Sequence, residues 1–339
     1  MLRFSVGYQP REDRDWVNCI LENRDRISEV FFAPYDIPNG RTGEWVIRND
    51  LSYERMVEVQ DRDLCAIARE GIPLNVLFNA GCYGKSARSK ELLGMVINRV
   101  KHYRDEFGLQ SVTTTSPFIA EAVKDLVDGV MTRASINMDI SSAQGMDYSA
   151  PYFDGYYLKR ELNRDLARIR SVRAWCDKNG KQLFMLANSG CLNDCSIRIF
   201  HNNLVAHGGE LEDVDKRYPL RGCRDYLMRE GKLPSLIKDT NWVRPEDIHL
   251  YDGLFDSIKL ATRVNRDPER ILKAYVAEKY DGSILDLLEP DHSYPLRGGR
   301  IENKLFPADF GERVGNCKKV CEDCDYCKIV FARTYVPAL

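Results

Sequence analysis

The chain alternates short apolar runs with longer, polar, helix-like stretches. Short apolar runs are typical of buried parallel strands, and apolar residues three or four positions apart are typical of the helices that cover them. The pattern predicts eight strands, the first starting at Arg3 and the others at 29–33, 74–79, 111–115, 129–134, 153–158, 182–187 and 255–260. Helices are predicted to end near Arg26 and to cover about 53–70, 90–107, 119–126 and 163–179. This alternation indicates strand–helix–strand units around one parallel sheet.

The eighth strand comes about seventy residues after the seventh, whereas the earlier strands follow one another at roughly twenty to forty-five residues. We therefore predict an insertion over 189–250. Eight strand–helix pairs favour an α/β fold of the (β/α)8 type, a TIM-like barrel whose catalytic face lies at the carboxyl ends of the strands. The alternative is an open doubly wound sheet, but the chain has neither Gly-x-Gly-x-x-Gly after the first strand nor a phosphate-loop motif. The predicted organisation is a barrel over 1–295 followed by a cysteine-rich, metal-binding tail over 296–339.

The composition is that of a globular protein. Of the 339 residues, 44% are hydrophobic and 29% are charged, and the formal net charge is -2. These values argue against a disordered chain and disfavour nucleic acid as a constitutive partner, although a local basic patch is allowed. The first residues lack the apolar core of a signal peptide, and no stretch approaches the length of a membrane span, so we expect a cytoplasmic protein without membrane insertion. Its 11 cysteines would then stay reduced, and clustered ones would bind metal or perform redox chemistry.

The densest cysteine cluster lies near the C-terminus. It consists of Cys317, Cys321, Cys324 and Cys327, named here the tail thiols. Their spacing is close to that of ferredoxin-type ligands, and four thiolates so near in sequence can converge on a 4Fe–4S cluster at little loop-closure cost. Zinc could use the same ligands, but zinc sites usually pair two Cys-x-x-Cys knuckles across a longer loop. The tail is therefore predicted to hold an iron–sulfur cluster, with zinc as the alternative.

A second cluster follows the seventh predicted strand. It consists of Cys191, Cys195 and Cys223, named here the mouth thiols. Spacing alone is weak evidence, because one helical turn produces it by chance and free cysteines are often buried apolar residues. A position just past a barrel strand, at the catalytic face, favours ligation of a metal cluster.

Other polar residues are candidates for contact with substrate. His201 and His207 lie in the insertion and could donate protons or bind metal, since imidazole titrates near neutrality. Polar residues at strand ends are placed to line a barrel mouth, and we expect about half of them to touch a ligand. These residues are Asn79, Thr115, Arg133, Asn137, Arg160, Glu161, Asn188 and Arg263.

The order of several segments resembles the U32 peptidase family, also called collagenase-like. The matching segments are 158–162 with the helix after it, 182–191, 221–223 and 256–260, and the resemblance covers roughly residues 1–280. It implies a barrel carrying a cysteine-ligated 4Fe–4S cluster, and the better understood members are oxygen-independent hydroxylases of RNA bases or ubiquinone precursors. On this resemblance the mouth thiols match three of the cluster ligands.

The chain departs from the family pattern in two ways. The first cysteine pair is usually spaced more widely than Cys191 and Cys195, and no cysteine occurs around 241–244, where a fourth ligand is expected. Cys82, just past the third strand, could be that ligand, as could one of the tail thiols. Alternatively, the cluster has three thiolates and an open iron that binds substrate.

The leading hypothesis is an iron–sulfur-dependent enzyme, similar to those hydroxylases, with one or two 4Fe–4S clusters. It would modify an RNA base or a small aromatic or anionic molecule held by Arg133, Arg160 and Arg263. One alternative is a U32-type peptidase with a structural metal, in which Cys191 or Cys223 pairs with His201, although His-Glu-x-x-His and Gly-x-Ser-x-Gly motifs are absent. The other is a non-catalytic iron–sulfur subunit that docks a protein partner, as in a heterodimer.

Overall fold

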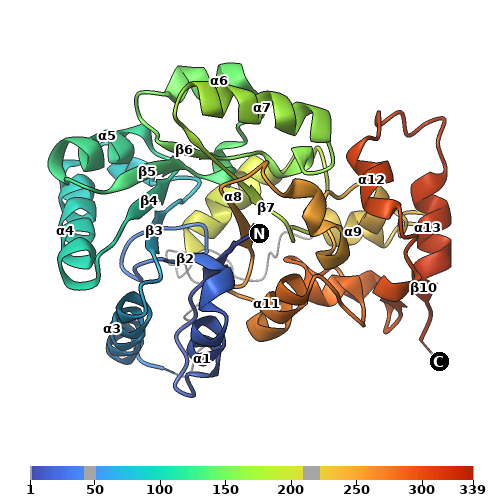
Figure 1. Ribbon diagram of the computed structural model, residues 1–339, viewed down its shortest axis with the longest axis horizontal. Coiled ribbons are helices and arrows are strands. Elements are labelled where there is room, and N and C mark those ends of the chain that lie inside the picture. The colour runs from blue at the N-terminus through green and yellow to red at the C-terminus, as the bar shows by residue number, and fades with distance from the viewer. Residues whose placement is uncertain (1, 42–50, 209–221, 339) are drawn as a thin grey trace.

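The computed structural model describes residues 2–41, 51–208 and 222–338, and eight parallel strands close into a barrel at its centre (Figure 1). The strands follow chain order around the barrel, and β1 pairs with β8 to complete the ring. They are β1 Phe4–Gly7, β2 Ile27–Phe32, β3 Leu74–Phe78, β4 Ser111–Thr114, β5 Met131–Ala134, β6 Gly155–Tyr157, β7 Gln182–Leu186 and β8 Ser257–Leu260. The predicted barrel is confirmed, and the open doubly wound alternative is wrong because the sheet has closed on itself.

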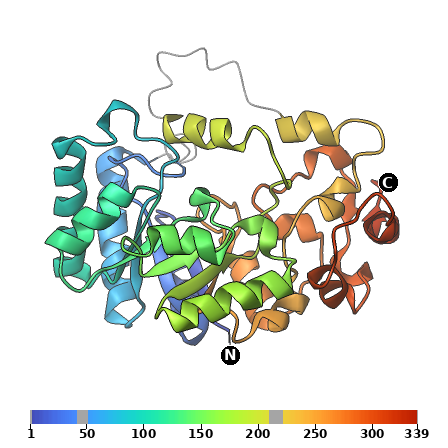
Figure 2. The same ribbon diagram turned by 90° about the horizontal axis from the view of Figure 1, so that it is seen from above.

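Helices surround the barrel (Figures 1 and 2). They are α1 Asp15–Glu22, α3 Tyr53–Arg69, α4 Lys90–Phe107, α5 Pro117–Leu126, α6 Ala143–Ser149, α7 Leu166–Lys178 and α11 Pro268–Ala277. Four of these helices begin after a serine whose side chain accepts a hydrogen bond from the N–H three residues later, as N-cap serines do. These serines are Ser52, Ser89, Ser116 and Ser142. No helix in the described ranges is both long and apolar enough to cross a membrane.

The connection from β7 to β8 departs from the repeat. Its described residues form α8 Arg198–Ala206, α9 Gly222–Leu227, α10 Ser235–Lys238 and the 3-10 helix η6 Pro245–Tyr251. The η6 helix packs against α11. Elsewhere in this connection, which is part of the predicted insertion, α10 packs against the C-terminal helix at 326–334. Residues 209–221 of that insertion lie outside the described residues.

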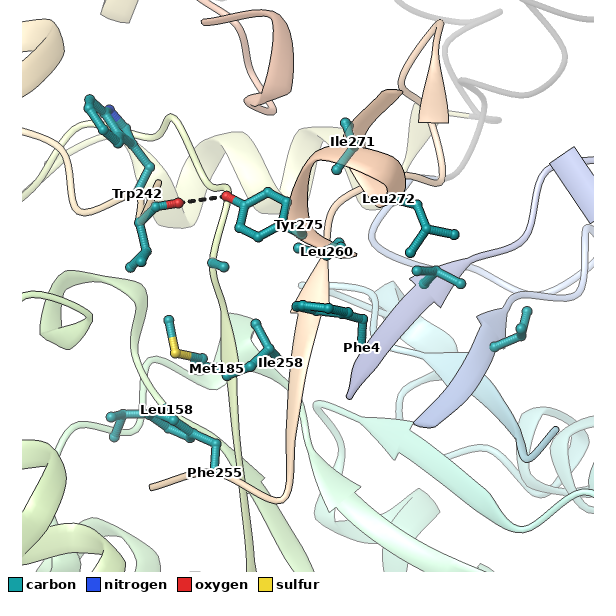
Figure 3. Packing of buried hydrophobic residues seen from close by; sticks show 14 of the residues in the cluster. Phe4, Leu158, Met185, Trp242, Phe255, Ile258, Leu260, Ile271, Leu272 and Tyr275 are labelled. Carbon is teal, nitrogen blue, oxygen red and sulfur yellow. Dashed lines mark hydrogen bonds between the residues drawn. The ribbon is translucent and has the colours of Figure 1, made fainter. Parts of the chain in front are cut away.

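The main hydrophobic core lies between the strands and the outer helices. Figure 3 shows Phe4 of β1 with Ile258 and Leu260 of β8, close to Tyr275 of α11. The Tyr275 hydroxyl donates a 2.6 Å hydrogen bond to the main-chain oxygen of Val243, so its polar atom is satisfied within the core. Side chains alternate between the two faces of a strand. Because Ile258 and Leu260 face the outer helices, Lys259 between them faces the inside of the barrel.

Residues 296–338, the C-terminal segment, pack against the side of the barrel. The segment contains β9 Arg300–Ile301, α12 Phe310–Gly315, α13 Tyr326–Thr334 and β10 Tyr335–Val336, and its two strands pair antiparallel. Phe310 stacks on Trp242 with 6.0 Å between ring centroids, and both belong to the same cluster of buried residues as the barrel core. The Arg164 guanidinium lies 4.5 Å from the Trp242 ring. A continuous core therefore joins this segment to the barrel, and a domain boundary at residue 295 stays a prediction.

Candidate functional site

Helix α8 crosses the end of the barrel at which the strands finish, named here the barrel mouth (Figure 2). At the start of α8, buried Arg198 forms an ion pair with buried Glu161, which follows β6. Farther along α8, a Cβ built on Gly81 would lie only 3.0 Å from Asn202, so the loop after β3 packs closely on the helix. The helix thus reaches from the β6 side of the mouth to the β3 side.

The three mouth thiols lie together where the chain leaves β7. Cys191 and Cys195 follow this strand, and Cys223 lies on α9. Burial raises the pKa of the Cys223 thiol to about 11, and the thiols of Cys195 and Cys191 contribute to the same shift. Such an effect places the three sulfur atoms within electrostatic reach of one another. The structure therefore brings together three cysteines that the sequence separates by up to about thirty residues.

The loop before Pro290 holds the end of β7 in place. The Asn188 side chain donates a 2.8 Å hydrogen bond to the main-chain oxygen of Leu287. A Cβ on Gly190 would lie 2.0 Å from the Pro290 oxygen, so only glycine fits there. Cys191, the next residue, is thereby fixed relative to this loop. Asn188, predicted to line the mouth, supports the position of Cys191 through these contacts.

Arg160, one of the predicted site residues, contacts a mouth thiol. Its guanidinium donates hydrogen bonds to Cys191 Sγ at 3.4 Å and to Asn137 Oδ1 at 3.3 Å. The Asn137 amide in turn donates a 3.1 Å hydrogen bond to the main-chain oxygen of Asn79. Arg160 therefore places a positive charge beside the sulfur, and Asn137 connects it to the β3 side of the mouth.

Glu161, another predicted catalytic residue, is engaged by two cations. Its carboxylate pairs with Arg198, and its main-chain oxygen accepts a 2.9 Å hydrogen bond from Lys319 Nζ. Lys319 lies in the loop between Cys317 and Cys321. This contact brings the loop of the tail thiols to the rim of the barrel mouth, one residue from Arg160.

The tail thiols also lie near one another. Burial raises the pKa of the Cys327 thiol, Arg164 opposes this rise, and the three other tail thiols add to it. Arg164 is buried and donates hydrogen bonds of 3.1 and 2.9 Å to the main-chain oxygen of Trp242. It is therefore a fixed positive charge next to the tail thiols.

The chemistry of both thiol groups fits an iron–sulfur cluster, because thiolates are the usual ligands of such clusters. In the described part of the chain, no three side chains of Cys, His, Asp or Glu are arranged to hold a single metal ion. In a 4Fe–4S cube each thiolate binds a different iron, so its ligands stand farther apart than those of one ion. The type of donor atom, a thiolate sulfur, fits a cluster, and ligation itself stays a prediction.

Cys82 lies on the other side of the mouth from Cys195. Its sulfur accepts a 3.2 Å hydrogen bond from the N–H of Gly84, in the turn after β3. A Cβ on Gly84 would lie 3.3 Å from the His207 ring, so Cys82 and His207 are close to the same turn. The nine residues of α8, about 13 Å of helix, separate this turn from Cys195. His201 lies within α8 and is exposed.

The barrel interior holds a charged network that the sequence analysis missed. Glu29 of β2 accepts hydrogen bonds from Ser5 at 2.8 Å, Asn75 at 3.0 Å and Tyr157 at 3.2 Å. It also forms an ion pair with Arg133 of β5, and both residues are buried. Burial alone would raise the pKa of Glu29, but Arg133 and the hydrogen bonds hold it below its usual value. Arg133, predicted at the mouth, therefore lies within the barrel and is paired with Glu29.

Lys259 and Arg263 add two basic side chains to this interior. Lys259 of β8 is 8% exposed, and burial together with Arg263 lowers the pKa of its amine to about 7. Arg263, just past β8, packs against Gly7, where an added Cβ would lie 2.8 Å from the arginine Cβ. Glu29 and Lys259 could have been identified from the sequence, because each is a charged residue at an inward position of an otherwise apolar strand.

No profile of a known protein family matches the sequence. The chain is similar to the uncharacterized protease MJ1657 of Methanocaldococcus jannaschii, with 25% identity over 269 residues that cover 77% of this chain and 76% of the relative. Its structure is similar to that of the U32 peptidase Mk0906, with a TM-score of 0.54, 15% identity, and coverage of 76% of this chain and 92% of the other. At this identity the structural likeness establishes the fold. The chain is thus similar in sequence to an uncharacterized protease and similar in fold to a U32 peptidase.

Proposed function

We propose that the protein is an iron–sulfur-dependent enzyme that modifies its substrate at the barrel mouth, in the manner of an oxygen-independent hydroxylase. The observation that carries this proposal is the meeting of Cys191, Cys195 and Cys223 where β7 ends. Active sites of (β/α)8 enzymes lie at this face of the barrel. Three thiols at one point also suit a ligand role better than that of a single nucleophile, which needs one thiol and a base.

The bound cluster would supply electron transfer or an open iron for an oxygenated ligand. Arg160 contributes positive charge beside Cys191 and is itself held by Asn137. This arrangement stabilises negative charge at the thiol site, whether on sulfur or on a substrate, because charge-assisted hydrogen bonds are stronger than neutral ones.

The charges within the barrel favour an anionic substrate. Glu29 is paired with Arg133, and Arg263 adds positive charge beside that pair. Cations in a site with low-dielectric walls raise the local concentration of anions. An acid or a phosphorylated compound therefore suits this site better than a neutral molecule.

Anaerobic purification with iron and sulfide analysis tests the proposal. With a 4Fe–4S cluster at both thiol groups we expect about eight irons per chain, and about four if the tail thiols hold zinc. Replacing Cys191 with alanine should remove about four irons because it deletes a mouth ligand. In the eight-iron case, replacing Cys317 should remove the other four.

Cys65→Ala is the matched control, since Cys65 lies on the outer helix α3 away from both thiol groups. It should leave the iron content unchanged. Fewer than about two irons per reconstituted chain, or equal iron in Cys191→Ala and the unmodified protein, would overturn the cluster proposal.

A peptidase is the second candidate function, favoured by the names of the curated relative and of the structural relative. Its nucleophile would be Cys191 or Cys223. Hydrolysis of a denatured protein by the metal-free chain, abolished by Cys191→Ala or Cys223→Ala but not by Cys65→Ala, would support this function. The absence of hydrolysis under these conditions would exclude it.

A further inference from the structure

Lys259 is a buried amine that neither thiol group uses. Its side chain extends from β8 into the barrel, with Nζ 3.6 Å from the ring centroid of Phe31 and 4.9 Å from that of Tyr157. Phe31 belongs to β2 and Tyr157 to β6, so the amine reaches between rings from both sides of its own strand. Ring faces attract an ammonium, but they do not replace the hydrogen bonds that water would give it.

The Lys259 amine differs from that of a lysine whose role is to hold the fold together through hydrogen bonds. Within residues 2–41, 51–208 and 222–338, Lys259 Nζ makes neither a hydrogen bond nor an ion pair, although the residue is only 8% exposed. Lys181 shows the structural case, because its Nζ donates hydrogen bonds of 2.8 and 2.7 Å to main-chain oxygens. Buried polar groups are nearly always hydrogen-bonded, and exceptions need an explanation.

We propose that Lys259 is a nucleophilic amine that forms a Schiff base with a small anionic carbonyl compound, such as a 2-oxo acid. The inference goes beyond the proposed function and does not rest on a bound cluster. Arg263, buried close to Lys259, supplies the charge that holds the anionic group of the compound.

The surroundings of Lys259 keep a large share of its amine neutral at neutral pH. Burial lowers its pKa to about 7, and Arg263 and Arg133 act in the same direction. The other charged or titratable groups that face it are Glu29, Tyr157 and Glu289, of which the two carboxylates act in the opposite direction. Only a neutral amine has the lone pair that attacks a carbonyl carbon, so this environment activates the nucleophile.

The step is balanced without a further reactant. The amine lone pair forms a C–N bond to the carbonyl carbon, and the carbonyl oxygen leaves as water with the two protons of the amine. The product is an imine, and no electrons are gained or lost by the protein or the compound. Arg263 and the Glu29–Arg133 pair keep their charges throughout.

Reductive trapping tests the proposal. The intact chain is incubated with pyruvate and sodium borohydride, and the reduced adduct is located by peptide mass mapping. We expect about one adduct per chain, at Lys259, with at least about ten times less at the exposed Lys304. Labelling should rise with pH to half its maximum near pH 7, because the amine loses its proton there, far below the ordinary lysine value of about 10.4.

Lys259→Arg keeps a cation but removes the nucleophile, and it should abolish trapping, whereas Lys304→Arg should trap as much as the unmodified chain. Acetone, a neutral ketone, should label Lys259 less than pyruvate does. If Lys259→Arg fails to fold, the peptide map of the unmodified chain still shows whether the adduct is at Lys259. Adducts spread evenly over exposed lysines, or no adduct at Lys259 above pH 7, would overturn the proposal. Because this readout does not involve iron, its failure leaves the cluster proposal standing.

Discussion

Replacing Arg133 with methionine is expected to lower the free energy of unfolding by about 3–5 kcal/mol. The substitution leaves the Glu29 carboxylate buried with hydrogen bonds from Ser5 and Asn75 but without its paired cation. Removing one partner of a buried ion pair is costly because the remaining charge is uncompensated. Urea denaturation at neutral pH measures the loss.

The double variant Glu29→Gln, Arg133→Met is the control, and it should recover most of the stability because neither charge remains. The contribution of the Glu29–Arg133 pair to stability also changes with pH in a defined direction. The pKa of Glu29 is lowered in the folded state, so the pair stabilises the fold above about pH 4.3, the ordinary glutamate value, and this contribution is lost as the pH falls through the folded-state pKa. A loss below about 1 kcal/mol in the single variant, or no recovery in the double variant, would contradict the assignment.

Trp242→Ala is expected to cost about 3–5 kcal/mol and to loosen the C-terminal segment from the barrel. The Trp242 side chain is fully buried, stacks on Phe310 and lies under the Arg164 guanidinium. Truncation removes both contacts and leaves a cavity. Limited proteolysis should then cut within 296–338 before it cuts the barrel, and chemical denaturation should show the loss.

Trp242→Phe is the matched control, because it keeps an aromatic ring against Phe310 and should lose less stability. If the alanine variant has the protease resistance of the unmodified chain, the C-terminal segment is held by contacts other than Trp242. A separate unfolding transition for residues 296–338 in the unmodified chain would instead support the predicted domain boundary.

The strands could be predicted closely from the sequence because parallel barrel strands are buried on both faces and appear as continuous apolar runs. The predicted run 182–187 corresponds to β7, Gln182–Leu186, and 74–79 corresponds to β3, Leu74–Phe78. The predicted helix starts at 53 and 90 match α3 and α4, and the predicted start of α5 at 119 is two residues late. The predicted start of α7 at 163 is three residues early, because Asp165 caps this helix by accepting a hydrogen bond from the N–H of Arg168.

The thiol groups could be predicted because cysteines are few and cluster in the sequence, and Arg160 followed from its position after a strand. The charged network inside the barrel could not be predicted in this way. Glu29 and Arg133 are 104 residues apart, and nothing near either residue shows that the other lies opposite it in the closed barrel. The C-terminal segment was described only by its cysteines, because its packing depends on Trp242, an aromatic residue from a distant part of the chain.

Helix α8 has a consequence for the shape of the substrate. Arg198 anchors its first turn to Glu161, and the loop of Gly81 packs against Asn202. While α8 holds this position, a folded macromolecule cannot rest its surface on the barrel axis. On the proposed function, we therefore expect the substrate to present a slender group at the mouth, such as a small acid, an extended side chain or a base turned out of its strand. We expect α8 to discriminate between substrates by size, with the bulk of a large substrate lying outside the helix.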